Sequence, residues 1–283
     1  MDDKNNPNSG NPRIFIDTNG ITVKCENCVV GYKEILNGIE YEVVDNDLIR
    51  KRRDEGVDMT KLCTSLVTDM SWLFFFSVFN YPENDWDFEN LMRWMDTIPE
   101  FNQSIGNWDV SNVTKMTSMF KGSSFNQPVE NWDVSKVINM SGMFEDSSFN
   151  QSIGKWDVSN VTDMSGMFSG SFFNQSIGKW DVSNVIYMTR MFNGSPFNQP
   201  IETWNVSKVT DMSLMFEGSK FNQPIGNWDV GLVTDMSLMF EDSKFNQNIS
   251  KWCVSKIPTE PIGFSKNSPL TEQNKPQWGT CPE

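Results

Sequence analysis

A strict period of 24 residues constrains this chain more than any other feature. Tryptophans recur at that spacing along most of its length: Trp108, Trp132, Trp156, Trp180, Trp204, Trp228 and Trp252. Towards the N-terminus, Trp86 lies 22 residues earlier, and Leu62 occupies the slot 24 residues before Trp86. A self-similar period of this length is typical of architectures in which each repeat packs against its neighbours. The chain is therefore expected to form one elongated array of about eight repeats.

Within one repeat, two different hydrophobic periods follow each other. Trp156 and Val158 are apolar with Asp157 between them, which is the alternation of a short strand. Residues 161–168 then place valine, methionine and phenylalanine three or four residues apart, which is a helical period. The pattern predicts one short strand and one helical turn or short helix in each coil, an α/β repeat. The methionines are interpreted as core, because an unbranched thioether fills irregular gaps between coils.

A Phe-Asn-Gln tripeptide closes the repeats, as in Phe149-Asn150-Gln151. The phenylalanines are expected to stack in the interior. An asparagine in a tight turn can satisfy backbone groups that no strand pairs. Stacked over successive coils, these asparagines predict a ladder, with direct ligand binding by Asn and Gln as the alternative.

Most repeat tryptophans are followed by an aspartate. These form a candidate exposed strand column for binding: Asp109, Asp133, Asp157, Asp181 and Asp229. Strands lie about 4.8 Å apart, and like charges at that spacing repel by about 0.9 kcal/mol in water. The carboxylates therefore accept hydrogen bonds from their own turns, or bind Ca²⁺ or a basic partner. Asn205 and Cys253 interrupt the column, which weighs against a metal.

Two further slots vary from repeat to repeat while the core slots stay uniform. The first slot is the candidate variable binding face: Lys115, Asn139, Asp163, Tyr187, Asp211 and Asp235. The second slot contains Lys121, Glu145, Ser169, Asn193, Glu217 and Glu241. Folding constrains only the core, so the outward positions are free to determine specificity for a partner.

The flanks of the array predict caps. Residues 1–12 are polar and are expected to form a disordered tail. Residues 13–61 are expected to form a cap with two hairpins and a short helix over residues 47–54, which is capped by Asn46 or Asp47. The basic run of that helix is interpreted as a solvated face. The array is assigned to residues 62–257, and prolines predict an irregular C-terminal cap over residues 258–283.

The unit that begins at Trp86 is two residues shorter than the others. This irregularity predicts a local bend or bulge in the array. Trp94 replaces a methionine in that unit and is a candidate exposed contact, although a buried tryptophan is the favoured interpretation.

Five cysteines lie outside the regular coils: Cys25, Cys28, Cys63, Cys253 and Cys281. The first two have CxxC spacing, but a lone pair without histidine cannot complete a structural zinc site. We expect the disulfides Cys25–Cys63 and Cys253–Cys281 as staples at the ends of the array, with Cys28 left free. Such bonds imply an oxidising compartment.

Composition argues against several classes of function. The formal charge of −14 disfavours nucleic acid as a partner. The chain has no histidine, the commonest general base, and shows no nucleophile paired with a base, phosphate loop or complete metal set. No run of about 18 apolar residues exists, and the first residues lack the pattern of a secretion signal. We therefore expect no enzyme activity, no cofactor and no membrane span.

The motif from Trp156 to Phe168, closed by Phe-Asn-Gln, resembles the repeat of BspA-like leucine-rich-repeat surface proteins and of mycoplasma lipoproteins. The resemblance covers residues 62 to about 257 and implies a right-handed solenoid of the leucine-rich-repeat type. It also implies extracellular or surface display, and adhesion or protein–protein contact with host matrix or cell-surface proteins. The alternatives are a structural spacer or self-assembling component of a surface layer or virion, and a Ca²⁺-dependent adhesin.

Overall fold

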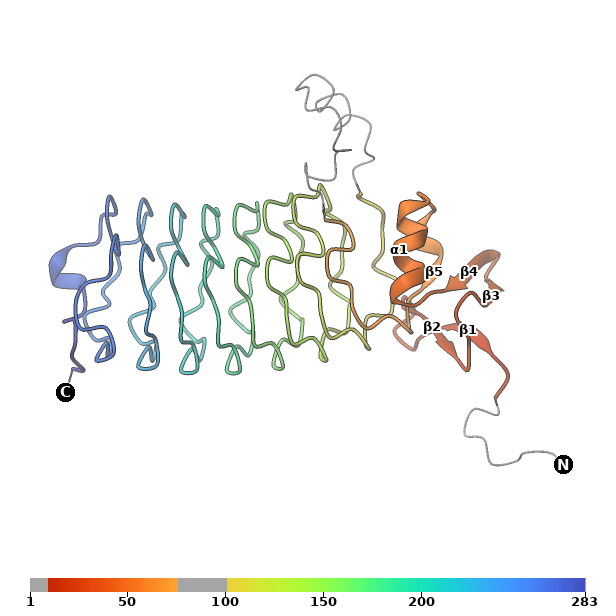
Figure 1. Ribbon diagram of the computed structural model, residues 1–283, viewed down its shortest axis with the longest axis horizontal. Helices are drawn as coiled ribbons and strands as arrows, with labels where there is room; N and C mark the ends of the chain where they lie inside the picture. The colour runs from red at the N-terminus through yellow and green to blue at the C-terminus, as the bar shows by residue number, and fades with distance from the viewer. Residues whose placement is uncertain (1–9, 76–100, 283) are drawn as a thin grey trace, which may run out of the picture.

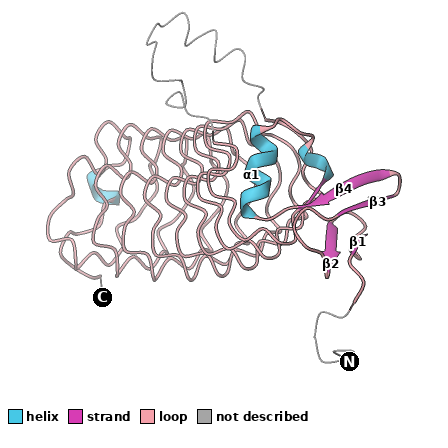
Figure 2. Cartoon of the chain, turned by 45° about the vertical axis from the view of Figure 1, so that its right-hand side comes forward, coloured by secondary structure: helices cyan, strands magenta, loops and turns pink. Residues whose placement is uncertain are grey.

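The computed structural model describes residues 10–75 and 101–282 of the chain. These residues form a row of similar coils along the long axis of the molecule, with a small head at the N-terminal end (Figure 1). Loops and turns make up most of each coil, whereas the strands and helix α1 gather in the head (Figure 2). Residues 1–9 of the predicted disordered tail lie outside the described part.

The head contains two antiparallel hairpins. β1 (Arg13–Ile16) pairs with β2 (Val23–Glu26), and β3 (Lys33–Leu36) pairs with β4 (Ile39–Val43). Both residues of the Asn-Gly turn between β3 and β4 have positive φ, which a type I′ turn requires. The two predicted hairpins are therefore present in the head.

Helix α1 (Asn46–Asp54) and the 3₁₀ turn η1 (Met59–Lys61) join the head to the coils. The N-cap of α1 is Asp45, one residue before the predicted candidates, because its carboxylate accepts the first two free backbone N–H groups. β5 (Leu62–Cys63) then pairs parallel with β4, which gives a three-stranded sheet of order β3-β4-β5.

The basic run of α1 is used within the molecule. Arg50 donates to the carbonyl oxygens of Asp69 and Ser71, at 3.2 and 3.0 Å. Arg52 forms an ion pair with Glu42 at 2.6 Å. The interpretation of this run as a solvated face is therefore wrong for these two arginines, which fasten the helix to the first coil and to β4.

Each regular coil carries a single parallel β-bridge to the next coil. The bridged residues form one column, which we call the bridge column: Asp69, Lys115, Asn139, Asp163, Tyr187, Asp211 and Asp235. In the described coils the predicted strand at the Trp156–Val158 position is absent. Hydrogen-bonded turns occupy the position of the expected helical turn. Gly166 and Gly170 explain the difference, since φ values of 62° and 64° interrupt a right-handed helix.

The interior consists of columns of identical side chains. Trp180 is 4% exposed, and its indole N–H donates to the carbonyl oxygen of Ile153 at 3.1 Å. Phe144 and Phe168 lie in adjacent coils with ring centroids 5.9 Å apart. The methionines of the coils are fully buried, which confirms their interpretation as core. Each coil therefore completes the core of its neighbour.

The Phe-Asn-Gln loops form a second, polar column. The side-chain oxygen of Asn174 accepts the backbone N–H of Asn198 at 2.9 Å and the amide of Gln199 at 3.1 Å. The same pair of bonds recurs from Asn102 to Asn246, one coil at a time. The predicted asparagine ladder is therefore confirmed.

The coil that begins at Leu62 lies directly against the coil of Trp108. Thr114 Oγ1 donates to the carbonyl oxygen of Thr68, 46 residues away, whereas the same bond from Thr162 spans 24 residues. The backbone N–H of Met70 likewise donates to Lys115. These two coils are therefore direct neighbours, and the bend or bulge predicted for the unit that begins at Trp86 involves residues, Trp94 among them, outside the described part.

The stack also continues past residue 257. Three backbone N–H groups of the preceding coil donate to this segment as regular coils do to their neighbours: Leu238 to Ile262, Phe240 to Phe264, and Asp242 to Lys266. Trp278 packs edge-on against Phe264, with centroids 4.9 Å apart. Among the described residues of this segment, the only helical element is the 3₁₀ turn η3 (Glu272–Asn274). The segment predicted as an irregular cap is thus a final, modified coil. Its prolines are tolerated because the coils contain no helix that proline would break.

Candidate interaction surface

The predicted aspartate column caps turns. Asp157 Oδ1 accepts the backbone N–H of Ser159 at 3.1 Å and its hydroxyl at 2.6 Å. Asn205 makes the same two bonds with Ser207, which explains why an amide can replace the acid. These hydrogen bonds match the first of the two compensations predicted for the column. Contact with the Ser183 hydroxyl and backbone N–H lowers the pKa of Asp181 below its usual value.

Asp133, Asp157, Asp181 and Asp229 are exposed, but Asp109 is only 4% exposed. The Ser65 hydroxyl donates to Asp109 Oδ2 at 2.6 Å, and β2 bridges the coil at Trp108. The prediction of Asp109 as part of an exposed strand column is therefore wrong, because the head covers the coil of Trp108 at this position. Among the described residues, no group of three or more histidine, cysteine or acidic side chains is placed to hold a metal ion.

Most side chains of the second variable slot bind side chains of the neighbouring coils. Lys121 and Glu145 form an ion pair at 2.8 Å. Asn193 accepts the hydroxyl of Ser169 at 3.3 Å and donates to Glu217 at 2.6 Å. Glu241 pairs with Lys266 of the final coil at 2.7 Å. Because its members bind one another, this slot contributes to stacking, and less of it remains for a partner.

The bridge column is the better candidate surface. Lys115 and Asp235 are exposed, and Tyr187 is 48% exposed between the half-buried Asp163 and Asp211 of the adjacent coils. One carboxylate oxygen of each aspartate in the column accepts a hydrogen bond from the backbone N–H two residues later, at 2.8 or 2.9 Å. The backbone therefore holds these side chains at a fixed spacing, and their identities change from coil to coil.

A neighbouring row of residues with positive φ, of which Trp72 and Arg190 are exposed, was missed in the sequence. Trp72 is 49% exposed and has a φ of 61°, and Arg190 is exposed with a φ of 58°. Leu214 and Leu238 share this left-handed slot and are half-buried. Glycine occupies the same slot at residues 142 and 166. These glycines could have revealed the row in the sequence, because recurrent glycine marks a position that requires positive φ. This row lies three residues after the bridge column and widens the candidate surface.

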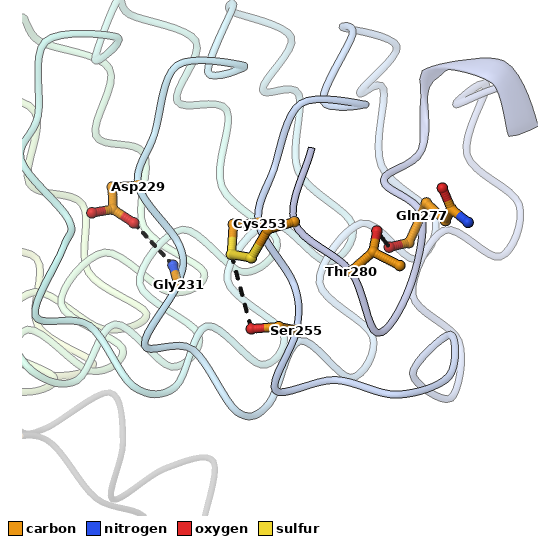
Figure 3. The surroundings of a disulfide bond; sticks show 7 residues. Asp229, Gly231, Cys253, Ser255, Gln277 and Thr280 are labelled. Atoms are coloured by element: carbon orange, nitrogen blue, oxygen red, sulfur yellow. Dashed lines mark hydrogen bonds between the residues drawn. A yellow bond between two sulfur atoms is a disulfide. The ribbon is translucent and has the colours of Figure 1, made fainter. Parts of the chain in front are cut away.

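Two of the five cysteines form a disulfide, and the other three are free thiols. Cys253 and Cys281 form the predicted disulfide, which ties the last tryptophan coil to the chain terminus (Figure 3). Cys25, Cys28 and Cys63 are free. The predicted Cys25–Cys63 disulfide is therefore not formed in this structure. The two cysteines lie on either side of the Ser65 hydroxyl, and their contact raises the pKa of Cys25 and lowers that of Cys63.

Comparison with known proteins identifies a repeat family. The chain matches the family described as Mycoplasma protein of unknown function, DUF285, in three overlapping segments: residues 49–130, 89–196 and 170–278. No curated protein and no solved structure matches it. Within residues 10–75 and 101–282, no helix has the length and apolar character needed to cross a membrane.

Proposed function

This chain belongs to the DUF285 family of Mycoplasma repeat proteins, and from that premise we propose that it is a non-enzymatic surface protein that binds other proteins. The bridge column and the adjacent left-handed row form its contact surface. The proposed architecture is a right-handed solenoid of the leucine-rich-repeat type. Stacked coils and parallel bridges support this proposal, as does the sequence resemblance to BspA-like proteins.

One observation carries the proposal. Buried columns repeat the same tryptophan, methionine and phenylalanine, whereas the bridge column changes from Lys115 to Tyr187 to Asp235 on the same rigid backbone. A long, regular face with non-uniform side chains suits recognition of a macromolecule. An exposed tyrosine held between two carboxylates also has the chemistry of a binding hot spot, because tyrosine contributes large contact area at low entropic cost.

The partner class that fits is a host matrix or cell-surface protein. The net charge of −14 favours partners with basic patches, since complementary charge speeds association. A virion component and a self-assembling surface layer are the other proposed settings. Extracellular or surface display is part of the same proposal.

The test is direct binding of the full chain to a panel of purified matrix and cell-surface proteins, with and without Ca²⁺. For a partner found in this way, Tyr187→Ala is expected to weaken binding about tenfold or more. Lys179→Ala is the matched control, because Lys179 is exposed but lies outside the bridge column. Equal binding by both variants would place the contact elsewhere on the molecule.

Sedimentation separates this proposal from the structural alternative. A chain that is monomeric and binds a partner supports the binding scaffold. Ordered self-association without any partner would favour a spacer or layer component. Loss of binding on removal of Ca²⁺ would favour the cation-dependent adhesin.

A further inference from the structure

Three thiols lie together where the head meets the first coil. Cys63, at the end of β5, is fully buried, and the half-buried Cys25 and Cys28 pack against the same small core. Cys25 lies in β2 two residues after Val23, whose carbonyl oxygen contacts the sulfur of Cys63, and Cys28 follows Cys25 by three residues. Cys25 is thus close to both of the other cysteines, and the three lead from the half-buried surface to the interior.

Several parts of the chain build this arrangement. The hydroxyl of Ser65 accepts the backbone N–H of Cys25 at 3.1 Å and lies 3.7 Å from the sulfur of Cys63. Ser65 donates in turn to the buried carboxylate of Asp109 in the first tryptophan coil. The sulfur of Cys63 also lies 3.7 Å from the carbonyl oxygen of Val23 in β2. The backbone and its hydrogen bonds therefore hold Cys25 and Cys63 together in the folded state.

We propose that Cys25, Cys28 and Cys63 form a thiol–disulfide exchange centre, which reduces a low-molecular-weight disulfide and ends with a disulfide between Cys25 and Cys63. Cys28 is the entry residue, because Cys63 is fully buried and the sulfur of Cys28 lies at the exposed carbonyl oxygens of Arg13 and Glu26, at 3.3 and 3.4 Å.

The exchange balances in three steps. Cys28, after losing its proton to solvent, attacks one sulfur of the external disulfide, forms a mixed disulfide and releases one external thiolate. The thiolate of Cys25 then attacks the sulfur of Cys28, which forms Cys25–Cys28 and releases the second external thiolate. The thiolate of Cys63 finally attacks Cys25, which forms Cys25–Cys63 and returns Cys28 to a thiol. Two protein thiols are oxidised and one external disulfide is reduced to two thiols.

The titration of the thiols affects the steps differently, because contact with Cys63 raises the pKa of Cys25 and so disfavours the thiolate of the second step. Burial raises the pKa of Cys28, so entry is expected to accelerate as the pH rises through and above the usual thiol range. Contact with Cys25 lowers the pKa of Cys63, which favours the thiolate needed for the last step. The product joins β2 covalently to β5 and so fastens the first hairpin to the start of the stack.

The test is to treat the reduced full chain with oxidised glutathione, quench with acid, and map the cysteine peptides by mass spectrometry over time. The wild-type chain is expected to accumulate Cys25–Cys63. Cys63→Ala should stop at Cys25–Cys28, and Cys25→Ser should retain glutathione on Cys28. Cys28→Ser should form Cys25–Cys63 roughly tenfold more slowly. The Cys253–Cys281 peptide reports the oxidant supply in every sample, and circular dichroism confirms that each variant is folded.

Two results would overturn the proposal. In the first, folded Cys28→Ser forms Cys25–Cys63 at the wild-type rate, which removes the entry role. In the second, Cys25, Cys28 and Cys63 all remain thiols while Cys253–Cys281 re-forms, which removes the exchange centre altogether.

Discussion

Replacing Trp180 by alanine tests whether stacking of identical side chains holds the molecule together. Trp180 is 4% exposed, lies 6.4 Å from the ring of Phe168, and donates its indole N–H to Ile153 of the preceding coil. Truncating a buried aromatic side chain to alanine costs about 3–5 kcal/mol, because apolar contacts are lost and a cavity remains. We expect a loss of stability in that range.

Trp180→Phe separates the hydrogen bond from the packing. Phenylalanine keeps much of the ring but removes the indole donor at 3.1 Å, while the carbonyl oxygen of Ile153 still accepts the backbone N–H of Trp156. Loss of one hydrogen bond costs about 0.5–1.5 kcal/mol, so this variant should fall between the wild type and Trp180→Ala. Asp181→Ala is the control in the same coil, since it removes only an exposed turn cap and should cost less than about 1 kcal/mol.

Urea unfolding followed by tryptophan fluorescence and circular dichroism measures the three values, and hydrogen exchange shows whether the coils on either side of residue 180 open together. If Trp180→Ala lowers the free energy of unfolding no more than Asp181→Ala does, stacking of the tryptophans does not hold the molecule together. Faster hydrogen exchange in the coil of residue 180 alone would contradict it as well, because nearest-neighbour coupling requires the adjacent coils to respond.

Three further outcomes are expected. Asn174→Ala should lower the free energy of unfolding by about 1–3 kcal/mol in urea titrations, because its oxygen accepts two hydrogen bonds from the next coil. Cys253→Ser should cost about 2–4 kcal/mol locally and speed hydrogen exchange in residues 258–282, whereas unchanged exchange would mean that packing alone holds this coil. A hydrogen bond from Arg52 lowers the pKa of Glu42 from 4.5, so this pair stabilises the fold above that pH and the contribution is lost as the pH falls through the lowered pKa. The melting-temperature difference between wild type and Glu42→Gln should therefore shrink from pH 7 to pH 3.

Side-chain columns were predictable because a period of 24 residues places equivalent residues in equivalent positions. This reasoning found the buried Trp180 column, the asparagine ladder and the turn-capping role of Asp157. The Cys253–Cys281 disulfide was predicted on another ground, the position of its cysteines at one end of the array, which also predicted the Cys25–Cys63 bond that is not formed. Each of these follows from chemistry that acts within one repeat or between two adjacent repeats.

Features that depend on backbone dihedral angles or on distant contacts were not predictable in the same way. The three-or-four spacing of residues 161–168 indicated a helix, but consecutive turns with left-handed residues such as Gly166 produce the same spacing. Burial of Asp109 depends on the head, which no local pattern connects to that coil. The continuation past residue 257 keeps the backbone hydrogen bonds while losing the motif.

The direct contact between the coils of Leu62 and Trp108 has a consequence for how such a chain can change length. Thr68 and Thr114 meet as regular neighbours although 46 residues separate them, and the register of every later coil is unaffected. These cross-coil bonds join residues on either side of residues 76–100, so the register of the stack does not depend on the length of that part of the sequence. A reporter or epitope inserted there is therefore expected to leave the packing of the coils on both sides unchanged.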